Sequence, residues 1–249
     1  MDAVLLEVAD AVATITLNRP ERLNVLDIGI AEALADAAQR AAASDAEIVV
    51  VTGTGRAFTA GGDVQAMAAS DDRSAFMLDL VGAANRAMTA LRAVRQPVVA
   101  RVNGIVAGAG IGIMLAADVA VAVDTATFTP AYGAIGLVPD CGATALLSRA
   151  IGERRARDLL LTGRRIDAAT ALEWGLLTRV VSPEELDGSV ADVLSAIRSA
   201  GPTAPSATKE LLDLDGSYAD ALAAERAAIA REAATPFAAA RLEAFARRG

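Results

Sequence analysis

The alternation of hydrophobic and polar residues predicts a protein in which short strands are followed by helices. Residues 3–8 and 11–17 alternate between apolar and polar side chains, which is typical of a β-hairpin. Short apolar runs near stretches with helical periodicity predict four further strands. These runs are residues 47–52, 98–102, 120–123 and 177–181. The order of these elements favours βαβ units, and therefore an α/β fold.

Helices are predicted where apolar residues recur every three to four positions. They are expected at about 28–43, 64–69, 74–95, 110–117, 153–161 and 168–174. A further helix is expected to start at Pro139-Asp140, where Asp140 would cap the first turn. Beyond Pro183 the pattern is helical throughout, at about 184–199, 203–212, 217–233 and 236–247. We therefore expect an α/β core over residues 1–183 and a helical region over residues 184–249, which would cover a substrate site or form a subunit contact.

Two loops rich in small residues lie where buried strands turn toward helices, namely Gly55–Asp63 and Asn103–Gly110. Small side chains let a ligand approach the main chain closely. The first residues of a helix also carry amide N–H groups without partners inside the helix. Together the two loops could hold one oxygen atom from two directions, which is the arrangement of an oxyanion hole.

The composition disfavours nucleic acid and membranes as partners. The chain of 249 residues has a formal net charge of −8 and only 3% aromatic residues, whereas nucleic-acid binding depends on excess Lys and Arg and on stacking. The opening residues do not form a targeting signal, and no stretch reads as a membrane span. A single cysteine, Cys141, excludes an internal disulfide and indicates a reducing compartment, which we expect to be the cytoplasm.

The chain contains no histidine. This excludes Ser–His and Cys–His nucleophile pairs as well as metal sites built on histidine. Acid–base chemistry must therefore use carboxylates, tyrosine, lysine or water. The glycines around the two loops do not match a phosphate loop or a dinucleotide fingerprint either.

Several dispersed motifs occur in an order that resembles the crotonase, or enoyl-CoA hydratase/isomerase, superfamily. Residues 17–24 resemble that superfamily's opening motif, and residues 57–63 and 102–110 resemble its two oxyanion loops. The resemblance continues through residues 136–140, 161–164, 175–176, 180–181 and 202–212, so that it runs nearly from end to end.

The resemblance implies a crotonase (ClpP-like) spiral of ββα units, with a helical C-terminal region that packs against neighbouring subunits in homotrimers or dimers of trimers. It implies acyl-CoA thioester substrates, with CoA as part of the substrate and no separate cofactor or metal. The oxyanion donors would be the backbone amides of Gly62 and Ala109. The other residues expected at the CoA thioester are Arg22, Leu23, Val25, Ala60, Gly61, Asp63, Val64, Gly110 and Tyr132.

The sequence departs from the hydratases of this superfamily, which place two glutamates over the substrate's double bond. The corresponding positions here are Gly112 and Tyr132, and neither is a carboxylate. One acid, Asp140, remains near the same space. The superfamily members with an acid at this position include enoyl-CoA isomerases and the epoxyphenylacetyl-CoA isomerase type. A single carboxylate suffices for isomerisation, because it can take a proton from one carbon and return it to another.

Each candidate residue also has a structural interpretation. Asp140 could cap a helix, Tyr132 could fill the space of the absent glutamate or act as a proton donor, and Asp63 could hold the amides of its own loop. Cys141 is expected to be a packed thiol rather than a nucleophile. Arg22, Arg56 and Lys209 could contact CoA phosphates or be solvated. At the level of function, isomerisation is the main hypothesis, and the alternatives are an enoyl-CoA hydratase and a catalytically idle acyl-CoA-binding subunit.

Overall fold

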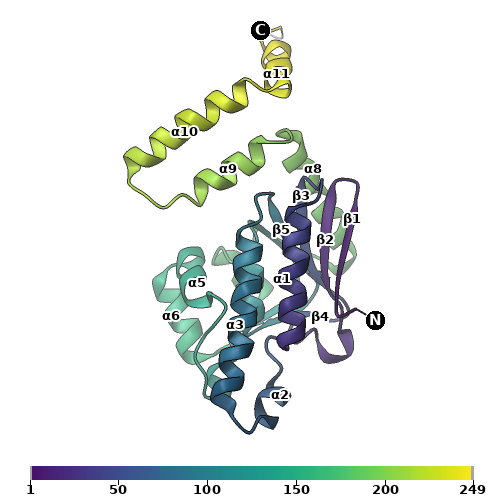
Figure 1. Ribbon diagram of the computed structural model, residues 1–249, viewed down its shortest axis with the longest axis vertical. Helices are drawn as coiled ribbons and strands as arrows, with labels where there is room; N and C mark the ends of the chain where they lie inside the picture. Colours follow the sequence, from purple (N-terminus) through teal and green to yellow (C-terminus); the bar gives the residue numbers. More distant parts are fainter. Residues whose placement is uncertain (1, 248–249) are drawn as a thin grey trace.

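Two β-sheets form the centre of the computed structural model, which describes residues 2–247 (Figure 1). The larger sheet has the strand order β1-β2-β3-β5-β7-β10, and the smaller has the order β4-β6-β8-β9. In the larger sheet the strands are Val4–Ala9, Val12–Leu17, Ile48–Gly53, Val98–Val102, Val119–Val123 and Arg179–Val181. In the smaller sheet they are Ala57–Thr59, Ile105–Ala107, Thr127–Thr129 and Ile166–Asp167.

The chain winds through both sheets as a spiral of ββα units. β3 is followed by β4 and then by helices, β5 by β6 and α4, and β7 by β8 and α5. Each turn of the spiral therefore adds one parallel strand to each sheet. Only the hairpin of β1 with β2 and the pairing of β8 with β9 are antiparallel. The α/β class and the ββα spiral expected from the sequence are confirmed.

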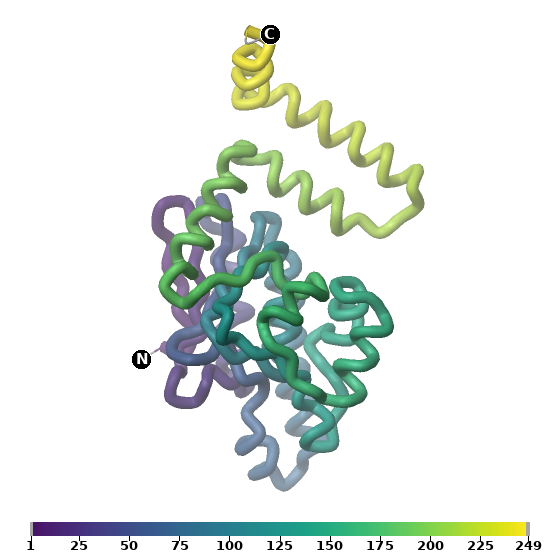
Figure 2. Tube along the Cα trace, turned by 180° about the vertical axis from the view of Figure 1, so that it is seen from behind, coloured from purple at the N-terminus to yellow at the C-terminus, as the bar shows by residue number. Residues whose placement is uncertain are grey.

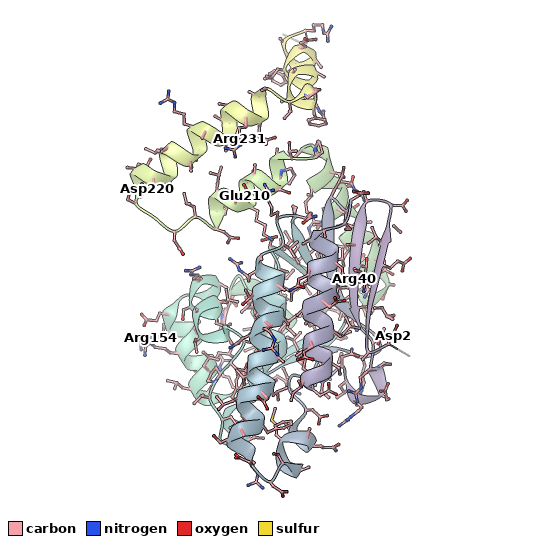
Figure 3. All side chains as sticks on the ribbon, viewed as in Figure 1. Asp2, Arg40, Arg154, Glu210, Asp220 and Arg231 are labelled. Atoms are coloured by element: carbon pink, nitrogen blue, oxygen red, sulfur yellow. The ribbon has the colours of Figure 1, made fainter. Side chains whose placement is uncertain are left out.

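Helices cover both faces of the larger sheet. α1 (Ile28–Ala42) and α3 (Arg73–Arg92) lie side by side over one face (Figure 1), and α8 (Leu186–Ser199) contacts β5 and β7 from behind (Figure 2). The facing sides of α1 and α3 are rich in buried alanine, which allows close packing. β3 is buried along its whole length because it lies in the middle of this arrangement. Charged side chains such as Arg40 and Arg154 point into solvent (Figure 3).

The remaining helices complete the core and form the C-terminal region. Their bounds are Val64–Ala69 (α2), Ala109–Leu115 (α4), Ala143–Ile151 (α5), Glu153–Thr162 (α6), Ala168–Glu173 (α7), Ala204–Leu212 (α9), Tyr218–Ala233 (α10) and Pro236–Ala246 (α11). Short 3₁₀ turns occur at Pro20–Arg22, Gly133–Ile135 and Pro183–Glu185. α10 and α11 extend away from the sheets at one end of the molecule (Figures 1 and 2).

The prediction of a helix starting at Pro139-Asp140 is wrong. α5 begins at Ala143, and its N-cap Gly142 makes no side-chain capping bond. Cys141 and Gly142 have φ values of 50° and 71°, in the left-handed region, so the chain makes a tight turn before the helix starts. Asp140 therefore lies in the segment before the helix and does not cap it.

The four strands of the smaller sheet were not expected from the sequence. They are two or three residues long, too short for a period to be visible, and two of them lie within the glycine-rich loops. Among residues 2–247, no helix is both long enough and apolar enough to cross a membrane.

Candidate active site

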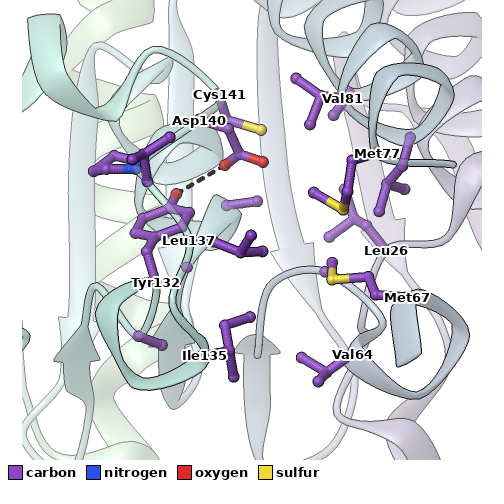
Figure 4. A pocket seen from close by; sticks show the side chains of 18 of the residues that line it. Leu26, Val64, Met67, Met77, Val81, Tyr132, Ile135, Leu137, Asp140 and Cys141 are labelled. Carbon is purple, nitrogen blue, oxygen red and sulfur yellow. Dashed lines mark hydrogen bonds between the residues drawn. The ribbon is translucent and has the colours of Figure 1, made fainter. Parts of the chain in front are cut away.

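A cavity of about 740 Å³ lies between α2 and α3 on one side and residues 130–142 on the other (Figure 4). Val64, Met67 and Met77 belong to the first wall, and Tyr132, Ile135 and Asp140 to the second. Gly62 and Ala109 also line the cavity. The structure therefore brings both predicted oxyanion residues and the predicted base to one space, although they are up to 78 positions apart in the chain.

The two oxyanion loops touch through glycines. A Cβ atom on Gly61 would lie 2.8 Å from the carbonyl oxygen of Ala107 and 3.3 Å from Cα of Gly108. Gly61 and Gly108 also have φ values of +93° and +51°, which favour glycine. Any side chain at Gly61 would thus push the loops apart, and the absence of one lets the two main chains meet beside the cavity.

The amides of Gly62 and Ala109 are available as donors. Ala109 is the first residue of α4, where an amide N–H has no acceptor inside the helix. Gly62 pairs with Leu26 through a β-bridge whose hydrogen bonds use the carbonyl oxygen of Gly61 and the amide of Asp63. Within residues 2–247, neither N–H donates to a protein acceptor. Two such donors at one cavity can stabilise a negatively charged oxygen.

A buried asparagine, Asn24, stabilises the first loop. The sequence indicated this residue only as part of the motif at residues 17–24. Asn24 is 1% exposed, and its side-chain amide donates to the carbonyl oxygens of Thr54, Ala57 and Phe58. The main-chain carbonyl oxygen of Asn24 accepts from the hydroxyl of Thr59. That hydroxyl in turn accepts from the backbone N–H of Gly61. This network fixes the backbone that carries Gly62.

Asp140 and Tyr132 form a hydrogen-bonded pair at the cavity wall. The phenol of Tyr132 donates to Oδ1 of Asp140 at 2.9 Å (Figure 4). Tyr132 is only 8% exposed, so its hydroxyl is held near the carboxylate rather than solvated. Tyr132 is therefore buried at the cavity wall and makes a specific contact that the sequence did not reveal.

Burial and the neighbouring charge keep Tyr132 and Cys141 protonated. Burial raises the pKa of the Tyr132 phenol far above its ordinary value, and the negative charge of Asp140 and the hydrogen bond to it raise that pKa further. The pKa of the buried Cys141 thiol is also raised, mainly by burial and to a smaller extent by the charge of Asp140 and the hydrogen bond to it. A thiol that resists ionisation is a poor nucleophile, as expected for a packed cysteine.

The backbone of residues 130–142 fills the space beside Gly112. A Cβ atom on Gly112 would lie 2.3 Å from the carbonyl oxygen of Cys141 and 2.8 Å from its Cβ atom. Position 112 therefore cannot carry any side chain in this backbone arrangement.

The other predicted binding residues surround the site. Ala60 and Val64 line the cavity, whereas six residues lie outside its lining: Arg22, Leu23, Val25, Gly61, Asp63 and Gly110. Asp63 caps α2 through the amide of Ala66 and pairs with the guanidinium of Arg22 at 2.9 Å. Asp63 thus holds its own loop. Lys209 is buried in an ion pair with Asp118 and is not available to a CoA phosphate.

Within residues 2–247, no group of three or more His, Cys, Asp or Glu side chains is arranged to hold a metal ion.

The enoyl-CoA hydratase/isomerase family matches residues 7–245, which is nearly the whole chain. The protein belongs to this family. It is 35% identical over 212 residues to a trans-2-decenoyl-[acyl-carrier-protein] isomerase of Streptococcus mutans, covering 84% of this chain and 81% of the relative. It is 36% identical over 198 residues to the 1,2-epoxyphenylacetyl-CoA isomerase of Escherichia coli, covering 75% and 72% of the two chains.

The fold of the family is also present in full. A crystal structure of a Thermobifida fusca protein described as an enoyl-CoA hydratase, in complex with CoA, superposes with a TM-score of 0.82 at 32% identity, covering 98% of this chain and 95% of that one. The crotonase fold expected from the sequence is thus confirmed. Relatives with isomerase and with hydratase names both occur, so the family alone does not decide between the two reactions.

Proposed function

We propose that this protein is an enoyl-CoA isomerase that moves a carbon–carbon double bond along the acyl chain of a CoA thioester. The observation that carries the proposal is that Asp140 is the one carboxylate among the described residues that line the cavity. One carboxylate is enough to take a proton from one carbon and return it to another. The hydratases' paired glutamates are replaced by Gly112 and Tyr132, which removes the usual means of ionising a water molecule.

The proposed reaction has two proton transfers. The carboxylate of Asp140 takes a proton from the carbon next to the double bond of a 3-enoyl thioester. The electrons of that C–H bond form a dienolate, which places negative charge on the thioester oxygen. The amides of Gly62 and Ala109 donate to this oxygen and stabilise the dienolate more than the substrate. Asp140 then returns the proton to the far end of the dienolate, which gives the 2-enoyl thioester.

The acyl chain is proposed to lie between α3 and residues 130–142. Leu26, Met67, Met77, Leu80 and Val81 line that part of the cavity and offer apolar contact. Methionine side chains adapt to irregular apolar shapes. The protein is therefore expected to act on apolar acyl groups.

The CoA portion is proposed to run past the segment from Arg22 to Val25 and past Ala60 and Val64. Ala60 and Val64 line the cavity, and the amide of Ala60 donates to the carbonyl of Leu23. This bond places the two segments side by side at the cavity. The complex of the T. fusca relative with CoA supports a CoA ligand in this fold.

We further propose that the chain assembles as a homotrimer or a dimer of trimers. α10 and α11 extend away from the sheets and carry large apolar side chains in solvent. These include Leu222, Ile229, Leu242 and Phe245, of which Phe245 is 80% exposed. Exposed apolar surface of this kind is typical of subunit interfaces.

The function is tested with 3-enoyl-CoA and 2-enoyl-CoA substrates in heavy water, with products read by mass spectrometry. Migration of the double bond, or exchange of deuterium into the α and γ carbons, is the expected result. Asp140→Asn keeps the shape of the side chain and can still accept from Tyr132, so folding and CoA binding should be retained. We expect its turnover to fall by at least about 100-fold, because it cannot accept a proton.

The matched control is Asp36→Asn, which changes an exposed carboxylate on α1 and should leave turnover unchanged. A gain of water by 2-enoyl-CoA without migration would show a hydratase. Binding of both thioesters with neither reaction would show an idle acyl-CoA-binding subunit. Full activity of Asp140→Asn would exclude Asp140 as the base.

A further inference from the structure

Tyr132 contacts the proposed base, Asp140, but takes no part in the two proton transfers of the proposed reaction. Its phenol is buried against Oδ1 of Asp140 at 2.9 Å. Figure 4 shows that the second carboxylate oxygen of Asp140 points away from Tyr132 toward the cavity. The two oxygens of Asp140 therefore have different surroundings, one held by the protein and one directed to the space where a substrate would lie.

A free aspartate is poorly suited to serve two carbon atoms in turn. Its terminal torsion is broad, so the carboxylate plane turns easily when nothing holds it. A hydrogen bond from a neutral donor to an ionised carboxylate is stronger than one between neutral groups. The bond from Tyr132 can therefore fix the plane of the carboxylate while it carries negative charge.

The backbone on both sides of the pair supports this role. Ala131, directly before Tyr132, has a φ of 63°, and Cys141, directly after Asp140, has a φ of 50°. Such conformations are uncommon for residues other than glycine and persist only where the surrounding structure imposes them. Both residues also line the cavity. The chain thus adopts costly conformations at the two positions that aim Tyr132 and Asp140 at one another.

We propose that Tyr132 is the positioning residue for Asp140: its phenol holds one carboxylate oxygen so that the other is presented to the acyl chain. This assignment rests on the proposed isomerase function. Tyr132 itself keeps its proton throughout, because the O–H bond is neither broken nor formed when Asp140 takes and returns the substrate proton. Its neutral form is also the one that burial favours.

The test is the variant Tyr132→Phe, which removes only the hydroxyl. The chain has two tyrosines, and the second, Tyr218, is 80% exposed at the start of α10, so Tyr218→Phe is the matched control. With 3-enoyl-CoA, kcat of Tyr132→Phe should fall about 10- to 100-fold, as expected for loss of a hydrogen bond to a charged group, with KM within about twofold of the wild type. The control should keep both values.

Each other outcome of this comparison overturns the assignment. An unchanged kcat in Tyr132→Phe shows that Asp140 needs no support from the phenol. A raised KM with unchanged kcat shows that Tyr132 contacts the substrate instead. A crystal structure of Tyr132→Phe is the second measurement: Asp140 should occupy more than one orientation, and a carboxylate in its original place would contradict the positioning role.

A second assay separates this inference from the proposed function. Exchange of the α hydrogens of a saturated acyl-CoA in heavy water requires deprotonation but no double bond. If the wild type exchanges without moving double bonds, isomerisation is excluded, and a slower exchange in Tyr132→Phe still supports the positioning role, whereas an equal rate overturns it. If the wild type neither exchanges nor isomerises, both proposals fail together.

Discussion

At the scale of single residues, Gly112 shows how the absence of a side chain shapes the site. It lies in α4 against the main chain of residues 130–142, and a Cβ atom there would lie 2.3 Å from the carbonyl oxygen of Cys141. A side chain at this position would have to displace the same segment that carries Tyr132 and Asp140. The absence of a side chain at position 112 and the placement of Asp140 are therefore linked by packing.

We predict that Gly112→Ala destabilises the protein, although alanine favours helices by about 1 kcal/mol over glycine. Overpacking of a fitted core costs about 1–3 kcal/mol, and a contact with backbone has little room to relax. The net loss should lower the melting temperature measured by calorimetry by a few degrees, and turnover should fall because Asp140 moves.

Gly188→Ala is the control for this change. Gly188 lies exposed in α8, and a Cβ atom there would meet no atom within 4 Å. This variant should keep or slightly raise the melting temperature. Equal melting temperatures of the wild type and Gly112→Ala would contradict the steric explanation.

At the scale of elements, α9 is tied to the core by a buried charge. The ammonium of Lys209 contacts Oδ2 of Asp118 at 2.9 Å and donates to the carbonyl oxygen of Gln96. Asp118 also accepts from the amide of Val98, at the start of β5. Lys209 is only 7% exposed, whereas the side chain of Asp118 is 26% exposed, so this ion pair connects α9 to the central sheet at the border between core and solvent.

We predict that Lys209→Met lowers the free energy of unfolding by about 1–2 kcal/mol, because it removes the cation from Asp118 while keeping most of the buried chain length, and the Asp118 side chain, which is 26% exposed, can be hydrated in its place. Urea unfolding followed by circular dichroism measures this loss. The control is Arg40→Met, which breaks an exposed pair with Asp36 on α1 and should cost no more than about 0.5 kcal/mol. Similar losses of unfolding free energy in the two variants would show that the Lys209–Asp118 pair contributes no more than an exposed ion pair.

The elements also show what could be predicted from the sequence. Long periodic stretches such as α1, and buried runs such as β5, carry a local signal that tertiary packing then reinforces, and both were predicted within one residue at each end. The turn at Cys141 and Gly142 carries no such signal, because its positive φ values follow from packing against α4. For this reason the sequence predicted a helix at Asp140 where the structure has a turn.

The candidate site also has a part that the sequence predicted and a part that it did not. The glycine loops predicted two main-chain donors at one place, because small side chains beside helix starts let a ligand approach free amide N–H groups. The hydrogen bond between Tyr132 and Asp140 joins side chains eight positions apart in an irregular segment. No periodic pattern predicts such a contact, so it could be recognised only in the folded structure.

At the scale of the whole molecule, α10 and α11 stand apart from the sheets (Figure 1). α8 contributes Leu186, Val190 and Val193 to the central core, whereas α11 has no fully buried residue. The proposed assembly would supply the missing cover by placing apolar side chains of α10 and α11 against another subunit.

We predict that the combined change Leu242→Glu and Phe245→Glu converts a trimer or hexamer into smaller species, because two charges would be buried at the proposed interface. Light scattering after size-exclusion chromatography measures the mass. Circular dichroism should be unchanged, since both side chains are exposed in the single chain. Leu161→Glu, at a leucine of α6 that is 83% exposed, is the control. A wild-type protein with the mass of one chain would contradict the proposed assembly.

Residues 130–142 hold the acid and its tyrosine, while the main-chain donors at the cavity come from two other loops. In the proposed reaction, the donors to the thioester oxygen and the base are thus encoded by separate stretches of the gene. A lineage that exchanged one reaction for the other would have to change residues 130–142 and Gly112, which packs against them in α4, while the loops that carry Gly62 and Ala109 stayed the same. This separation offers a physical reason why one architecture supports both isomerases and hydratases.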